Sequence, residues 1–273
     1  MATSTLEAPR DGAALQAAAY RTKEFADGED RALWTAAWVA VGLTQQIPEA
    51  GDLLPYTVGD HGIHVQRAVD GRLLGRFNKA QHGGCRTIPA QCQRGVKTKC
   101  SYTSCGYSRD RRVIATAELE ESQRYAHQYL GMVPERLLSV AVKTWGSVIW
   151  VNLDPHGPPP FALPGAGLPT LEPWFANATT LVVDEWLEVE ANWKLAAGSV
   201  LAPLGSPTAP GPQGLVWQKI SLAPWAFAEG LGLPPLGARE AWALWAFPNL
   251  ALIALPSQVV TVVTQPTGLE TSL

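Results

Sequence analysis

Residues able to bind a metal or to react as thiols gather in one window of this chain. All four cysteines, Cys85, Cys92, Cys100 and Cys105, lie in this window, and His82 stands just before the first of them. Because thiolates and imidazoles are the usual donors of structural zinc sites, His82, Cys85, Cys100 and Cys105 could hold a zinc ion. The cysteines could instead be buried free thiols, or Cys85 could form an inter-loop disulfide with Cys100 or Cys105.

An antiparallel β-sandwich is expected to position that window. The stretch from Lys79 to Arg112 is rich in Gly, Gln, Ser, Cys and Arg and lacks sustained periodicity, which predicts two loops around a short strand. A short helix near Phe25–Trp34 is expected to precede a strand-like run at Trp38–Val41. Asp70-Gly71 predicts a type I′ hairpin. The other strand-compatible segments are Leu53–Val58, Gly62–Ala68, Arg72–Asn78, Leu137–Lys143 and Ser147–Asn152.

A stretch dense in Pro and Gly, beginning after Asp154, divides the chain. We expect a flexible N-terminal arm at 1–20, a first domain at 21–155, a linker at 156–170 and a second domain at 171–273. The second domain is also expected to be β, with strands at Leu181–Val189, Leu215–Ser221, Ala241–Ala246, Leu250–Leu255 and Val259–Thr264.

Composition narrows the class of protein. With 273 residues, 47% of them hydrophobic, the chain can bury a sizeable core. The formal net charge of -3 and the lack of a long basic run argue against a nucleic-acid partner. Neither a signal-peptide pattern nor an apolar run long enough to span a membrane occurs, so we expect no membrane association and a cytoplasmic location.

Several short segments, in order and in register, resemble the α subunits of Rieske non-heme iron aromatic-ring-hydroxylating oxygenases. The resemblance extends from about Tyr20 to the end of the chain. It implies an α+β fold, mainly antiparallel β, with a Rieske-like β-sandwich domain followed by a helix-grip domain. The segments are Trp38-Val-Ala-Val-Gly, Ile47-Pro-Glu-Ala-Gly-Asp, Phe77-Asn with His82-Gly-Gly-Cys-Arg, Trp145-Gly-Ser-Val-Ile-Trp-Val-Asn-Leu-Asp, Asn192-Trp-Lys-Leu and Phe247-Pro-Asn.

The same resemblance marks where the metal ligands of the family would stand. A Rieske cluster takes two thiolates and two imidazoles from a Cys-x-His and a Cys-x-x-His pair. The matching positions here are Ala80, His82, Tyr102 and Cys105, so His82 alone is retained. We therefore expect no 2Fe-2S cluster.

The mononuclear iron site of the family also lacks its ligands. It would use two histidines and a carboxylate, but Gly205 and Pro210 stand at the histidine positions and Ala202 at that of the acid linking the two metal centres. The third ligand would lie beyond Leu273. The histidines other than His82 all precede the second domain: His61, His64, His127 and His156.

These substitutions predict a non-catalytic α-like subunit with no catalytic residues, a structural or regulatory partner in a hetero-oligomer. The partner would be an intact Rieske oxygenase α subunit, or further copies of this chain in a trimer. The second domain is expected to be incomplete, without a long closing helix, and to leave an open sheet edge. The alternatives are an unstable relic, a small zinc- or redox-binding module built on the cysteine loops, and an active oxygenase component.

Overall fold

The computed structural model describes residues 15–59, 61–77, 98–99, 106–107, 113–114, 138–161, 180–201, 215–221, 240–255 and 258–273. The chain begins there with α1 (Ala18–Arg21), α2 (Lys23–Glu29) and a π-helical turn (Asp30–Trp34). The Thr22 hydroxyl caps α2 by accepting from the Phe25 N–H at 3.4 Å. Ala19 in α1 is buried, so the last residues of the expected flexible arm belong to the folded structure.

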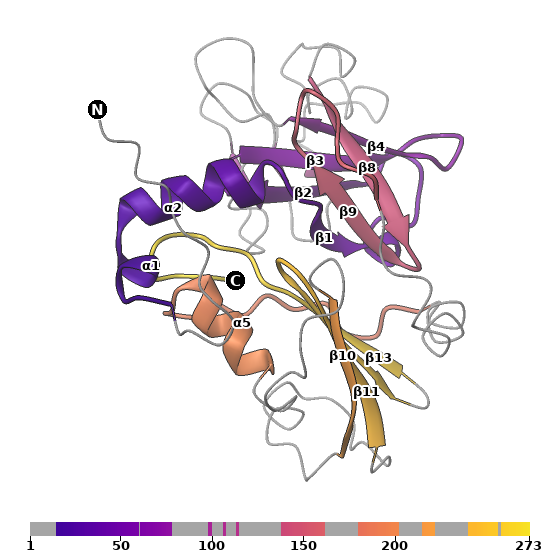
Figure 1. Ribbon diagram of the computed structural model, residues 1–273. Coiled ribbons are helices and arrows are strands. Elements are labelled where there is room, and N and C mark those ends of the chain that lie inside the picture. The colour runs from indigo at the N-terminus through magenta and orange to yellow at the C-terminus, as the bar shows by residue number, and fades with distance from the viewer. Residues whose placement is uncertain are drawn as a thin grey trace.

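The first sheet is six-stranded and antiparallel, in the order β1-β9-β8-β4-β3-β2 (Figure 1). Its strands coincide with short apolar segments of the sequence, and β1, β2 and β9 are buried along most or all of their length. Each strand predicted in this part of the chain is confirmed to within about two residues. They are β1 (Val39–Leu43), β2 (Leu53–Val58), β3 (His61–Arg67), β4 (Leu73–Phe77), β8 (Ser139–Trp145) and β9 (Val148–Asn152).

The hairpin between β3 and β4 differs from the prediction. The Ala68 N–H donates to the Arg72 carbonyl and the Gly71 N–H donates to the Ala68 carbonyl, which leaves three residues in the loop. Gly71 has a φ of 84°, the left-handed conformation of the last residue in such a loop. The predicted two-residue type I′ turn is therefore wrong. The prediction that Gly71 takes a positive φ in the hairpin loop is correct.

A small sheet follows β4, in the cysteine-rich window and just after it. It contains β5 (Thr98–Lys99), β6 (Gly106–Tyr107) and β7 (Val113–Ile114), all antiparallel, with Lys99 opposite Gly106. The sequence predicted one short strand in this window, and the structure forms two in it and a third just after it.

The second large sheet is four-stranded, in the order β10-β11-β12-β13. Its strands confirm four of the five predicted in the second half: β10 (Leu215–Ser221), β11 (Glu240–Ala246), β12 (Leu250–Leu255) and β13 (Gln258–Val263). The fifth prediction, a strand at Leu181–Val189, is wrong. Among the described residues the only β-bridge of this segment joins Val189 to Ser272, and Val182 and Leu187 are exposed.

Both apolar cores are shared between the two large sheets. One joins Val39, Val41 and Ile149 to Trp245 and Ala251. The other joins Ala40, Val148 and Trp150 to strands β11 and β12. Successive residues of β1 thus serve different cores, because alternate side chains of a strand point to opposite faces. Helix α5 (Trp193–Leu201) adds Trp193 and Ala197 to the first core, and Figure 1 shows it beside α1 and the C-terminal residues.

Candidate functional site

The predicted metal positions fall outside the residues that the structure describes. This holds for the proposed zinc ligands and for the positions at which the family would bind its cluster and its iron. Where the chain is described, the nearest elements are β4 before the cysteine window, β5 to β7 within or beside it, and α5 before the iron positions. The residues concerned are Ala80, His82, Cys85, Cys100, Tyr102, Cys105, Ala202, Gly205 and Pro210.

The three histidines that the structure describes lie in different surroundings. His64 is fully buried in β3, and burial, followed by the charge of Arg76, lowers its pKa from 6.5 to about 3. His61, at the start of β3, has its Nε2 3.2 Å from the Asp30 carboxylate. His156 is exposed beyond β9. Within the described ranges no group of three or more His, Cys, Asp or Glu side chains could hold a metal ion.

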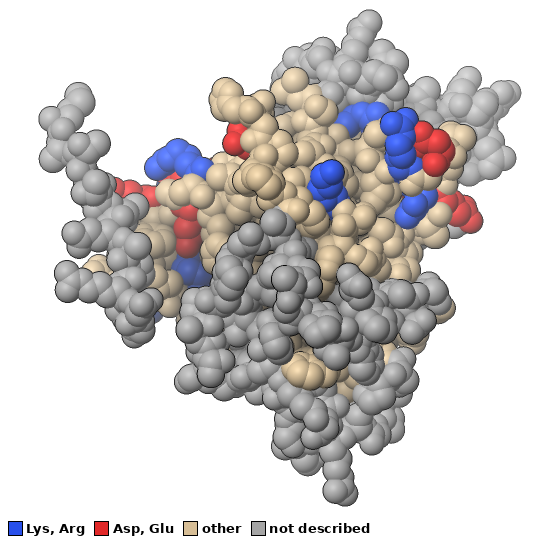
Figure 2. Space-filling model, turned by 45° about the vertical axis from the view of Figure 1, so that its right-hand side comes forward, with Lys and Arg blue, Asp and Glu red and all other residues tan. Residues whose placement is uncertain are grey.

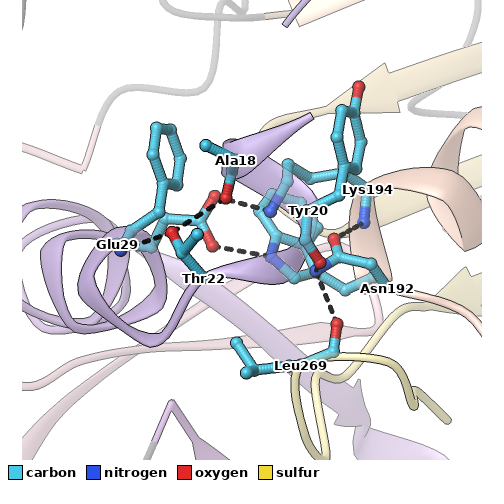
Figure 3. Close-up of polar contacts among 9 residues, drawn as sticks. Ala18, Tyr20, Thr22, Glu29, Asn192, Lys194 and Leu269 are labelled. Atoms are coloured by element: carbon cyan, nitrogen blue, oxygen red, sulfur yellow. Dashed lines mark hydrogen bonds and ion pairs between the residues drawn. The ribbon is translucent and has the colours of Figure 1, made fainter. Parts of the chain in front are cut away.

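The best-defined polar cluster surrounds the Asn192-Trp193-Lys194 motif at the start of α5 (Figure 3). The Lys194 ammonium lies 2.8 Å from one oxygen of the Glu29 carboxylate, and the Trp193 indole N–H donates to the other oxygen at 3.1 Å. The side chains of Lys194 and Glu29 are only 10% and 14% exposed. This ion pair therefore joins the end of α2 to the first turn of α5 in a place where water screens it poorly.

Aromatic rings complete the surroundings of the Lys194 ammonium. Its Nζ lies 5.1 Å from the Trp193 ring centroid, 5.4 Å from that of Tyr20 and 5.7 Å from that of Phe25. These distances fall within the range of cation–π attraction. The Trp34 ring packs edge-on against Trp193, with centroids 4.9 Å apart. The cluster thus immobilises the lysine.

Asn192 organises the backbone around the same point. Its side-chain oxygen accepts from the Lys194 N–H at 3.1 Å, as an N-cap residue does. Its amide nitrogen donates to the Tyr20 carbonyl at 3.1 Å and to the Leu269 carbonyl at 2.8 Å. A single side chain therefore begins α5 and joins it to α1 and to the C-terminal residues.

Asn249, in the Phe247-Pro-Asn motif, also joins distant parts of the fold through its side chain, as Asn192 does. We call these two residues, together with the contacts around them, the connectors. Its amide nitrogen donates to the Ala40 carbonyl at 2.8 Å, and its oxygen accepts from the Ala40 N–H at 3.0 Å. It also lies 3.2 Å from the Thr264 carbonyl and 3.4 Å from the Tyr56 hydroxyl. Burial raises the pKa of Tyr56 far above its usual value, so this phenol stays neutral. The Asn249 side chain thus bonds to both backbone groups of Ala40 in β1, as a neighbouring strand would.

Sequence reasoning identified both motifs but missed their partners. Glu29 and Lys194 are 165 residues apart, and Ala40 and Asn249 are 209 apart, so no local pattern pairs them. Neither connector presents a nucleophile or a proton-transfer pair to a substrate. On the face shown in Figure 2, basic and acidic side chains are interspersed over the described surface, without a large patch of one sign.

Comparisons with known proteins agree with this fold. No protein-family model matches the chain. The sequence is similar to the glycine betaine monooxygenase oxygenase subunit of Pseudomonas aeruginosa, with 25% identity over 158 residues, covering 58% of this chain and 35% of that protein. The match thus spans only about a third of that relative's length.

Among solved structures, Rieske oxygenases are again similar to this chain, and the similarity covers more of it. The quaternary ammonium Rieske monooxygenase CntA, in complex with γ-butyrobetaine, aligns with a TM-score of 0.58 and 15% identity over 93% of this chain and 71% of that one. Naphthalene 1,2-dioxygenase with indole bound aligns with a TM-score of 0.58 and 17% identity over 93% and 68%. In the part of the chain that the structure describes, no helix is long and apolar enough to cross a membrane.

Proposed function

Because the chain is a divergent relative of Rieske oxygenase α subunits, we propose that it is a non-catalytic member of that group, acting as a structural or regulatory partner in a hetero-oligomer. The observation that carries the proposal is the position of its histidines, of which none follows His156. A mononuclear iron held by two imidazoles and a carboxylate therefore has no imidazole available in the second half of the chain.

The donor sets at the family's metal positions do not fit the metals. At the cluster, Ala80 has no donor atom, Tyr102 stands where a thiolate is needed, and Cys105 stands where an imidazole is needed. At the iron, Gly205 and Pro210 offer no side-chain donor. These residues therefore do not support oxygenase chemistry in this chain.

Residues that support the architecture are retained where metal ligands are not. Asn192, Trp193 and Lys194 make buried contacts that place α5. Asn249 fixes the second large sheet to β1. Retention of the connectors without the ligands favours a role in which the fold, and the surface it presents, is what the protein supplies.

The metal part of this proposal is tested by measuring iron and the visible absorption spectrum of the full chain purified under anaerobic conditions. We expect neither stoichiometric iron nor the absorption of a Rieske cluster. The matched variant combines Ala80→Cys, Tyr102→Cys and Cys105→His, which restores the ligand set of the cluster. After reconstitution with iron and sulfide, this variant should show cluster absorption. Adding His82→Ala to that variant should abolish the gain. A Rieske spectrum in the unaltered chain would overturn the proposal.

The partner is tested by co-expression with an intact Rieske oxygenase α subunit. We expect the two to elute together in size-exclusion chromatography, in a ratio measured by native mass spectrometry. A homotrimer would support self-assembly as the alternative. If the chain elutes alone as a monomer and melts cooperatively, the scaffold role is wrong.

A zinc site at the cysteine window is the second candidate function. The observation in its favour is the pairing of Lys99 with Gly106, because these two residues flank the segment that carries Cys100 and Cys105. Elemental analysis should then find about one zinc per chain, lost on chelation together with stability. Cys100→Ser should abolish zinc binding and Cys92→Ser should not. Zinc-free protein of unchanged stability would exclude this site.

A further inference from the structure

Two consecutive acids at the end of α2 bind partners in different parts of the fold. Glu29, the last residue of α2, pairs with Lys194 of α5 at 2.8 Å. Asp30, the first residue of the π-helical turn, lies 3.2 Å from Nε2 of His61 in β3. Consecutive residues of a helix project about 100° apart, so one turn can reach two partners on different sides.

The backbone around Asp30 is built for this arrangement. Its carbonyl accepts from both the N–H and the hydroxyl of Thr35, at 3.0 Å and 2.9 Å, which is the longer ring of a π-helical turn. Gly59, between β2 and β3, has a φ of 54°, and a Cβ there would collide with the Asp30 carboxylate. The turn and the glycine together let this carboxylate reach the first sheet.

The two contacts differ in burial, which sets their strengths. The pair formed by Glu29 and Lys194 is largely removed from water and receives a second hydrogen bond from Trp193. The side chains of His61 and Asp30 are 28% and 23% exposed, so water weakens their attraction more. The contact with α5 is thus the firmer of the two.

We propose that the helical segment Ala18–Trp34 is a clasp that sets the position of α5 against the six-stranded sheet, with Glu29 and Asp30 as its two positioning residues. The shared cores and Asn249 join the sheets to each other. Helix α5 takes its ion pair with Glu29 and the bond from Asn192 to the Tyr20 carbonyl from this segment, and its other polar attachment is the bond from Asn192 to the Leu269 carbonyl. The clasp goes beyond the proposed function, because it holds whether or not the chain binds iron or a partner.

Hydrogen exchange of the full chain, followed by mass spectrometry, tests the clasp. In Glu29→Gln, peptides from α5 should exchange at least about tenfold faster, because breaking a buried pair is costly and its effect begins locally. Peptides from β2 and β12 should keep their protection. Asp27→Asn is the matched control, since Asp27 lies on the same helix but pairs with Lys23 in an exposed site, with side chains 40% and 78% exposed. It should change nothing.

Asp30→Asn distinguishes a clasp from two unrelated contacts. Asp30 is paired with β3 and not with α5, yet a clasp predicts faster exchange in α5 as well as in the π-helical turn. Unchanged exchange of α5 in this variant would overturn the proposal, as would an equal loss of protection in β12 in either variant. If Glu29→Gln fails to fold, the double variant Glu29→Gln/Lys194→Met avoids leaving an unpaired buried charge. The ion pair between α2 and α5 is still absent in it, so α5 should exchange faster than in the unaltered protein while β2 and β12 keep their protection.

Discussion

Acid should destabilise this protein through one buried imidazole. His64 lies within β3 with no exposed surface, and burial, reinforced by the charge of Arg76, lowers its pKa to about 3. In the unfolded chain its pKa returns to about 6.5. Below that pH the unfolded state binds a proton that the folded state does not, so stability falls as the pH falls from 6.5 toward 3.

The size of the effect follows from the two pKa values. Between pH 8 and pH 5 the proton taken up by the unfolded His64 should cost the folded state about 2 kcal/mol. Because the imidazole is buried, solvent does not reduce this free-energy cost by screening. The assay is urea unfolding of the full chain at several pH values, comparing the unaltered protein with His64→Gln. The difference between the two profiles isolates His64 from the carboxylates that titrate in the same range.

Between pH 8 and pH 5, the free energy of unfolding of His64→Gln should fall by about 2 kcal/mol less than that of the unaltered protein. Replacing the exposed histidine in the same way, His156→Gln, is the control, and its profile should follow that of the unaltered protein. If the His64→Gln profile runs parallel to that of the unaltered protein, the imidazole keeps a solvent-like pKa and the reasoning from burial is refuted.

Three further changes test the connectors and the packing by urea unfolding. Asn249→Ala should cost about 3 kcal/mol, because it leaves buried backbone groups of β1 without partners; a loss below 1 kcal/mol would mean that water replaces the amide. Trp193→Phe removes the hydrogen bond to Glu29 and should cost about 2 kcal/mol, with most of that loss absent when Glu29→Gln is already present. Gly75→Ala should cost about 1–3 kcal/mol, because a Cβ there would lie 2.5 Å from Val142 of β8; an unchanged midpoint would show that β8 moves aside.

Much of the fold could be predicted from the sequence because its strands follow local periodicity. Leu215–Ser221 and Leu250–Leu255 were predicted with the bounds that β10 and β12 have, since apolar runs with clear breaks at each end identify strands. Leu181–Val189 has comparable apolar residues, but a strand also requires a neighbour to bond with, and periodicity contains no information about neighbours. Helix α5 was marked only by its motif.

The polar contacts that matter could not be predicted in the same way. Nothing local to Glu29 indicates that it meets Lys194, and nothing near Ala40 indicates that an amide will bond to both its backbone groups. Such pairs are set by how the elements pack, and packing depends on the whole chain. The residues at the metal positions could be compared with the ligands of the family from sequence alone, because metal ligands are residues of particular types at fixed spacing. That these positions bind no metal remains a prediction.

The bond between Asn249 and Ala40 also bears on synthesis of the chain. Ala40 leaves the ribosome 209 residues before its partner, which at ordinary elongation rates is a delay of roughly 10 to 40 s. During that interval the face of β1 that carries Ala40 lacks β11 and β12, which later cover it, and this face is open to other nascent chains. A polypeptide interrupted before β11 would keep that surface exposed, and we expect such fragments to be held by chaperones or degraded rather than to accumulate.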